Sequence, residues 1–130
     1  MHVVAAPDKF RGTASALEVA TAVERAVAEH GGTTAVLPMA DGGEGTLEAL
    51  GGPNQTSLVT GPLGGLIEAP WQLTGTTAII EMAKASGLIT IGGPEFNEVL
   101  NATSAGTGEL ILSAVEHGAT RIIVGLGGSA

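Results

Sequence analysis

Charged side chains and glycines gather in four short segments of this sequence, at residues 7–12, 38–45, 103–108 and 125–130. The first segment carries Asp8, Lys9 and Arg11 directly after an apolar run. An arginine can grip a carboxylate or phosphate with two parallel hydrogen bonds, and a lysine supplies a compact positive charge. We therefore interpret Lys9 and Arg11 as anion-binding residues. The alternative is a surface loop whose charges are solvated or pair with one another.

The second segment places two carboxylates three residues apart, Asp41 and Glu44, with Gly42 and Gly43 between them. Carboxylates beside a phosphate site usually hold Mg²⁺ or accept a proton from a hydroxyl group. The glycines would let the backbone approach a ligand closely. The alternative is structural, with Asp41 as the N-cap of a helix and Glu44 as its capping-box partner. The spacing fits both interpretations.

The third and fourth segments are rich in glycine and hydroxyl groups. Ser104, Gly106, Thr107 and Gly108 open an expected helix, and amides at a helix start can bind an anion without a charged side chain. The alternative is a plain N-cap by Ser104 or Thr107. The final segment, 125–130, matches the start of a dinucleotide fingerprint, which leaves a dinucleotide oxidoreductase as a further alternative.

The hydrophobic pattern predicts the elements that carry these segments. An apolar run at 3–6 predicts a buried strand, and Ser15 with Glu18 predicts a capping box for a helix that ends at Gly31. A strand at 34–37 would complete a parallel strand–helix–strand unit. The remaining elements are expected to be a short helix at 45–50, a hairpin of 58–60 with 66–73, a strand at 77–81, a helix at 110–115 and a strand at 121–124.

This order predicts an α/β protein. The turn-rich residues 51–54 mark the expected boundary between two lobes, 1–52 and 53–130. Three of the four chemical segments follow predicted strands, and ligands of open α/β sheets bind outside the carboxyl ends of strands. The last strand runs into a glycine-rich loop with no helix behind it. We therefore expect both lobes to be incomplete, in a truncated product, a fragment or half of a split protein.

Composition narrows the classes of partner. The 130 residues carry 13 acidic and 5 basic side chains, a net charge of −8, which repels nucleic acid and anionic membranes. The absence of cysteine excludes disulfides and thiolate metal sites. No apolar stretch approaches the length of a membrane span, and no basic region precedes the first apolar run. We expect a cytoplasmic protein.

Six blocks together resemble the type-one family of bacterial glycerate kinases over the whole chain. The most specific is Pro-Met-Ala-Asp-Gly-Gly-Glu-Gly at 38–45. The others are Ala-Pro-Asp-Lys-Phe-Arg-Gly-Thr at 6–13, Thr-Gly-Pro-Leu-Gly at 60–64, Glu-Met-Ala-Lys-Ala-Ser-Gly-Leu at 81–88, Ala-Thr-Ser-Ala-Gly-Thr-Gly-Glu-Leu-Ile at 102–111 and Gly-Leu-Gly-Gly-Ser-Ala at 125–130.

The resemblance implies a Rossmann-like lobe, a second α/β lobe, and transfer of the γ-phosphoryl group of ATP to a hydroxyl of D-glycerate with Mg²⁺. Both the 2- and the 3-hydroxyl remain open as the acceptor. Members of this family continue beyond the final block with a Thr-Asn-Asp-Gly-Gly stretch that carries a catalytic aspartate. This chain stops before it and is expected to be inactive alone.

Within this hypothesis each candidate residue has a role. Lys9 and Arg11 bind glycerate carboxylate or nucleotide phosphate, Asp8 orients their loop, and Asp41 and Glu44 serve Mg²⁺ or the reacting hydroxyl. The phosphate-binding set is Gly42, Gly43, Ser104, Gly106, Thr107, Gly108, Gly127, Gly128 and Ser129. The alternative is a non-catalytic nucleotide- or phosphate-binding fragment or half of a complemented enzyme. An exposed sheet edge would favour association with another chain or a second copy.

Overall fold

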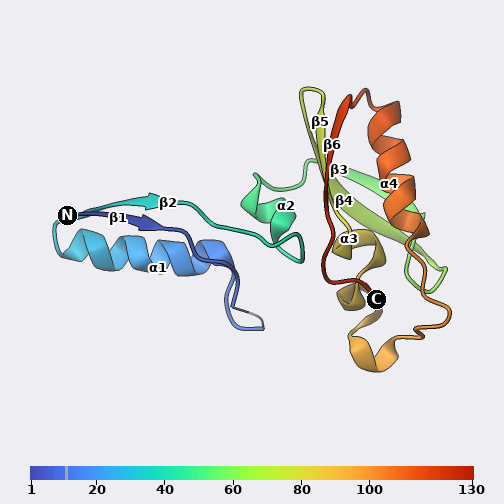
Figure 1. Ribbon diagram of the computed structural model, residues 1–130, viewed down its shortest axis with the longest axis horizontal. Coiled ribbons are helices and arrows are strands. Elements are labelled where there is room, and N and C mark those ends of the chain that lie inside the picture. The colour runs from blue at the N-terminus through green and yellow to red at the C-terminus, as the bar shows by residue number, and fades with distance from the viewer. Residues whose placement is uncertain (11) are drawn as a thin grey trace. The chain divides into compact units, whose positions relative to one another are not determined.

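The computed structural model describes residues 1–10 and 12–130 (Figure 1). Its residues form two compact units, 1–41 and 42–130, and each has both helix and strand, as expected for the α/β class. The sequence predicted a lobe boundary after residue 52, whereas the compact units divide after residue 41. The reason is α2 (Thr46–Ala49), whose buried Leu47 donates its backbone N–H to Glu81 of the second unit.

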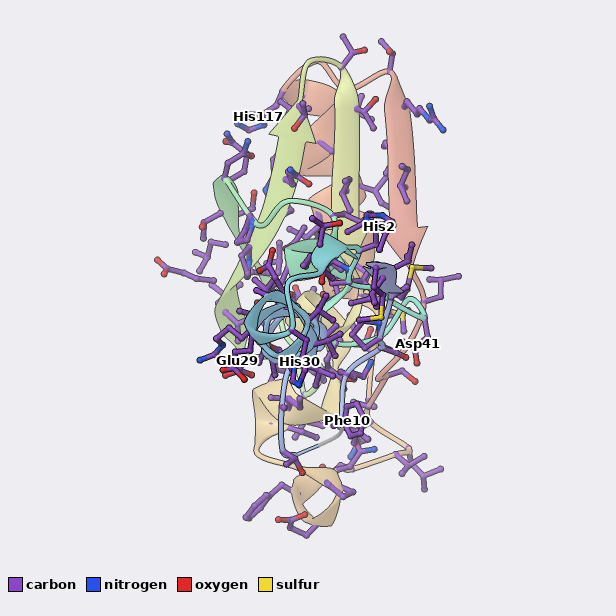
Figure 2. All side chains as sticks on the ribbon, turned by 90° about the vertical axis from the view of Figure 1, so that its left-hand side faces the viewer. His2, Phe10, Glu29, His30, Asp41 and His117 are labelled. Atoms are coloured by element: carbon purple, nitrogen blue, oxygen red, sulfur yellow. The ribbon has the colours of Figure 1, made fainter. Side chains whose placement is uncertain are left out.

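The first unit is a parallel strand–helix–strand. β1 (His2–Ala5) pairs with β2 (Thr33–Val36), and α1 (Ala16–Glu29) connects them. The predicted capping box is present, because the Ser15 hydroxyl accepts the Glu18 N–H while the Glu18 carboxylate accepts the Ser15 N–H. The helix ends at Glu29 with His30 as its C-cap, and the predicted stop, Gly31, follows with a φ of 70°. Figure 2 views this unit from the carboxyl end of α1, where Glu29 and His30 lie.

The prediction of a buried first strand holds for only one face of that strand. In β1 only Ala5 is buried, and Val4 is 59% exposed. Strand side chains alternate between the two faces of a sheet. In the described part of the first unit only α1 packs against this sheet, so this unit by itself covers one face of the apolar run.

The second unit is built on a mixed sheet. Among the described residues its strands are β3 (Gln55–Thr60), β4 (Leu66–Thr74), β5 (Thr77–Glu81) and β6 (Arg121–Gly125), and they lie in that order. β3 and β4 form the predicted antiparallel hairpin, whereas β5 and β6 are parallel. The connection between the parallel pair contains α3 (Ala83–Ser86), two 3₁₀ turns, η1 (Leu88–Ile91) and η2 (Pro94–Phe96), and α4 (Ala105–Glu116).

The core of the second unit lies between the sheet and α4, which covers one of its faces (Figure 1). Trp71 is fully buried there with Ile80 and Leu110. Its indole N–H donates to the Ser57 hydroxyl at 3.0 Å, so the polar atom of this large side chain is satisfied. Trp71 is therefore a packing residue, as predicted.

Candidate functional site

Two loops of the first unit meet beyond the carboxyl ends of its strands. The β1–β2 pairing continues past both strands, because Leu37 donates to the Ala5 carbonyl at 2.8 Å and Met39 to the Pro7 carbonyl at 2.9 Å. This extended register brings the Lys9 ammonium to 3.1 Å from the Asp41 carboxylate. The lysine side chain is only 15% exposed, whereas that of Asp41 is 49% exposed. A cation and a carboxylate 32 residues apart thus lie together beyond the carboxyl ends of two neighbouring strands, as predicted.

Asp8 contacts the backbone of the lysine that follows it. Its carboxylate accepts the backbone N–H of Lys9 at 2.7 Å, a hydrogen bond between neighbouring residues. This contact agrees with the predicted orienting role, which stays a prediction. Arg11, the second predicted cation, lies outside the described residues.

In the second unit the glycine-rich segments 42–45 and 125–128 lie backbone against backbone. A Cβ on Gly125 would lie 2.8 Å from the Gly42 carbonyl oxygen, and one on Gly127 would lie 2.7 Å from the Gly43 nitrogen. A Cβ on Gly128 would collide with the Glu44 carboxylate. Glycine is required for so close an approach of two backbones. Gly125 and Gly127, which suggested a dinucleotide fingerprint, serve here to pack the two loops together.

The structural alternative for Asp41 and Glu44 is wrong. The N-cap of α2 is Gly45, in a left-handed conformation with a φ of 92°. Because glycine has no side chain, the N-cap residue makes no side-chain hydrogen bond to the first turn of the helix. The cap comes from elsewhere: Glu81, at the end of β5, accepts the Leu47 N–H at 2.9 Å. The 42–45 loop is further tied to the helix by the Thr46 hydroxyl, which donates to the Gly43 carbonyl at 2.7 Å.

Glu81 and its neighbours form a charged cluster. Glu81 is fully buried, and Lys84 lies between it and Glu48, with its ammonium 3.8 Å from the Glu81 carboxylate and 3.0 Å from that of Glu48. Burial raises the pKa of Glu81, although the Leu47 amide and the lysine act in the opposite direction. Burial also disfavours the charged form of Lys84, but the Glu48 hydrogen bond and the Glu81 charge outweigh it and raise the pKa of Lys84.

The start of α4 is organised by packing as much as by capping. Ser104 is the N-cap residue, as the structural alternative expected, but its side chain makes no cap hydrogen bond. The Thr103 hydroxyl instead accepts the Ala105 N–H at 3.1 Å. Gly106 is buried so tightly that a Cβ there would collide with the Thr60 carbonyl oxygen, while Gly108 faces open space. Among the predicted phosphate-binding residues of this segment, Ser104 and Gly108 are exposed and Thr107 is buried.

Ser86 links this helix start to the last segment of the chain. Its hydroxyl lies 2.8 Å from the Thr107 hydroxyl, and its carbonyl accepts the Ala130 N–H at 3.0 Å. Beside it, Leu88 donates to the Gly128 carbonyl, and Gly87 forms a bridge with Ser129. In the second unit, therefore, Gly42, Gly43 and Glu44 pack against residues 125–128. Ser86 and Gly87 link Thr107 to the segment that contains Ser129. The sequence did not single out Ser86, although it lies in the Glu-Met-Ala-Lys-Ala-Ser-Gly-Leu block.

The acidic residues of the described chain could bind Mg²⁺ only together with other ligands. The described residues contain no group of three or more histidine, aspartate or glutamate side chains that could hold a metal ion by themselves. Mg²⁺ in kinases is commonly held by one or two carboxylates together with substrate phosphates and water. Asp41 in the first unit and Glu44 in the second are each a carboxylate that could supply one ligand group of this kind.

None of the helices in the described part of the chain is long and apolar enough to cross a membrane.

Comparison with known proteins assigns the family. The model of the Glycerate kinase family matches residues 3–130. Glycerate 2-kinase of Escherichia coli (strain K12) is 48% identical over 138 aligned positions, and glycerate kinase of Bacillus subtilis (strain 168) is 44% identical; both alignments cover 100% of this chain and 36% of the relative.

A solved structure agrees with this result. "Crystal structure of putative glycerate kinase 2 from Salmonella typhimurium LT2" matches with a TM-score of 0.81 and 45% identity over 99% of this chain and 36% of that one. The chain therefore spans about a third of the length of the proteins it resembles, as expected for a portion of a longer enzyme. The chain belongs to the glycerate kinase family.

Proposed function

We propose that this chain forms part of an enzyme that transfers the γ-phosphoryl group of ATP to a hydroxyl group of D-glycerate. The observation that carries the proposal is the family match over residues 3–130. The name of the Escherichia coli relative, glycerate 2-kinase, supports the 2-hydroxyl as the acceptor. We place the reaction in the cytoplasm.

The residue roles follow from what phosphoryl transfer requires. The reaction depends on positioning and charge neutralisation more than on covalent chemistry. Lys9, with Arg11, would bind the glycerate carboxylate or a nucleotide phosphate, and the bond from Asp8 to the Lys9 amide would set the loop. The 3.1 Å pair of Lys9 and Asp41 supports this assignment, because it places a cation beside a potential proton acceptor.

The second unit would supply the backbone cradle for phosphate. The closely packed loops support this role, since peptide N–H groups can approach a ligand where no side chain intervenes. The cradle would be formed by Gly42, Gly43, Ser104, Gly106, Thr107, Gly108, Gly127, Gly128 and Ser129. Glu44, beside Gly128, would serve Mg²⁺ or the reacting hydroxyl. We propose the same role for Asp41 in the first unit. When bound, Mg²⁺ would neutralise phosphate charge.

The lobes that the sequence predicted, a Rossmann-like lobe at 1–52 and a second α/β lobe at 53–130, remain part of this proposal. A second candidate function is favoured by the 36% coverage of the relatives. The isolated chain would then bind nucleotide or phosphate without turnover, or act as half of a complemented enzyme. Association through an unpaired sheet edge belongs to this candidate, and light scattering tests it.

The experiment is a coupled assay of ATP-dependent D-glycerate phosphorylation by the complete protein that contains this chain. The 130-residue chain is assayed in parallel, and its binding of ATP is titrated directly. Formation of 2-phosphoglycerate by the complete protein supports the proposal, and absence of any phosphoglycerate contradicts it. Binding of ATP by the short chain without turnover supports the second candidate.

Lys9→Met is expected to lower kcat/KM by about ten- to a hundred-fold, the effect of losing a hydrogen bond to a charged ligand. Arg25→Met is the matched control, because it removes an exposed cation from α1 in the same unit. Full turnover by Lys9→Met would remove the anion-binding role. An equal loss in both variants would show that the effect comes from net charge alone.

A further inference from the structure

Among the described residues of the second unit, Glu81 is the one ionisable side chain that is fully buried. It lies at the carboxyl end of β5 with no exposed surface. One carboxylate oxygen accepts the Leu47 N–H. The other has no hydrogen-bond partner within the described part of the chain and faces the Lys84 ammonium, at 3.8 Å. Burying a carboxylate with an unsatisfied oxygen is costly, so a structure that retains one requires an explanation.

The explanation lies in the helix amide that the other Glu81 oxygen binds, the N–H of Leu47 in α2. The first N–H groups of a helix have no partners within the helix and need acceptors from elsewhere. For α2 the N-cap is Gly45, which has no side chain, so a carboxylate 34 residues along the chain supplies the acceptor. The amide that it binds follows Thr46, whose hydroxyl and backbone N–H both donate to the Gly43 carbonyl.

We propose that Glu81 is a positioning residue: by capping α2 from β5, it holds the 42–45 loop, with Glu44, against the 125–128 loop. The importance of that loop for phosphate rests on the proposed function. Glu81 acts through Leu47 and Thr46, and its full burial keeps it away from a substrate.

The charges around the carboxylate support this arrangement. Lys84, on α3, lies 3.8 Å from Glu81 and 3.0 Å from Glu48, which belongs to α2 itself. The lysine therefore links α2 and α3 across the buried carboxylate. Burial, with a smaller contribution from the Glu48 charge, raises the pKa of Glu81, although the amides of Leu47 and Gly45 and the Lys84 charge favour its charged form.

The experiment uses the 130-residue chain and compares Glu81→Leu with Glu81→Gln by amide NMR. Leucine removes the acceptor, whereas the glutamine side chain keeps one oxygen for the Leu47 N–H. We expect Glu81→Leu to speed hydrogen exchange at Leu47 by about ten- to a hundred-fold and to shift the Gly43 and Gly45 resonances. We expect Glu81→Gln to keep exchange within about three-fold of the unmodified chain. Glu109→Gln, which alters a carboxylate bound to Thr60 instead, should leave the Leu47 amide unchanged.

A titration of the unmodified chain keeps the test independent of folding of the variants. The Leu47, Gly43 and Gly45 amide shifts should titrate with the same midpoint as the Glu81 carboxyl carbon. Amides that do not follow Glu81, or a Glu81→Leu variant with an unchanged loop, would overturn the inference. ATP titrations of the same samples separate this proposal from the proposed function. Failure of the chain to bind ATP would count against its nucleotide site. The exchange rate of the Leu47 amide would still decide the role of Glu81.

Discussion

Two carboxylates of the second unit illustrate how surroundings decide the behaviour of a side chain. Glu109 accepts the Thr60 backbone N–H at 2.6 Å and the Thr60 hydroxyl at 2.8 Å, and these bonds lower its pKa. Burial raises the pKa of Glu81. Both residues are glutamates that bind a backbone N–H. Their pKa values shift in opposite directions because Glu81 is buried away from water. No local sequence pattern encodes that burial.

The lowered pKa of Glu109 predicts a pH-dependent contribution to stability. A carboxyl that binds protons less readily in the folded state contributes stability above its ordinary pKa of 4.5. That contribution is lost as the pH falls through the lower, folded value. Glu109→Gln should therefore unfold more easily in urea at pH 7, and its difference from the unmodified chain should shrink steadily below pH 4.5. A difference that stays constant with pH would show that the charge of Glu109 contributes nothing.

At the residue scale, the sequence predicted the Lys9–Asp41 neighbourhood from two strand ends. It could not decide whether Asp41 and Glu44 cap α2, because the spacing suits a cap and a ligand site equally. The structure rejects the cap because Gly45, in a left-handed conformation, begins the helix. The substitute cap, Glu81, is distant along the chain, so only the tertiary fold reveals it.

Among the elements, α4 is positioned by one glycine. Its buried Gly106 sits against the Thr60 carbonyl of β3, and there is no room for even a methyl group. Two positions later on the same helix, Gly108 faces open space. The two glycines of one motif therefore have different physical roles, the first in packing and the second without steric demand.

This contrast predicts opposite effects of the same substitution. Gly106→Ala should destabilise the chain by about 1–3 kcal/mol or more, because the new methyl group forces α4 away from β3. Gly108→Ala should be neutral or should stabilise it by roughly 0.5–1 kcal/mol, because alanine favours the helix. Urea unfolding followed by Trp71 fluorescence measures both. Equal effects at the two positions would contradict the packing role of Gly106.

Elements with a strong local signal were predicted well. The Ser15–Glu18 capping box and the β3–β4 hairpin are both present where expected. The sequence did not predict α3 or the 3₁₀ turns η1 and η2. These are single turns of three or four residues, too short to establish a helical period, and their conformation is set by contacts such as those of Gly87 and Leu88 with the 128–129 segment.

For the whole molecule, the two compact units have unequal cores. The buried apolar side chains of the first unit are mostly alanines with Val27, whereas the second buries Trp71, Ile80, Leu110 and Val59. Because stabilisation grows with the apolar area that is buried, the second unit should be the more stable.

This inequality predicts unfolding that is not two-state. Trp71 is the only tryptophan, so its fluorescence reports the second unit alone, while far-ultraviolet circular dichroism reports both. In urea, circular dichroism should show an early transition, mainly from α1, that fluorescence lacks. A single transition that coincides for both probes would show that the units unfold together.

The sequence by itself determined the α/β class, the order of the principal elements, and the segments that carry charge and glycine, because these depend on hydrophobic period, turn residues and local capping. Tertiary structure alone decided which of those segments touch. Three contacts each join residues that are far apart in the chain: the packing of 42–45 against 125–128, the cap that Glu81 provides for α2, and the packing of Gly106 against Thr60. Such contacts arise when strands and helices pack together, so their partners cannot be inferred from the pattern around either one.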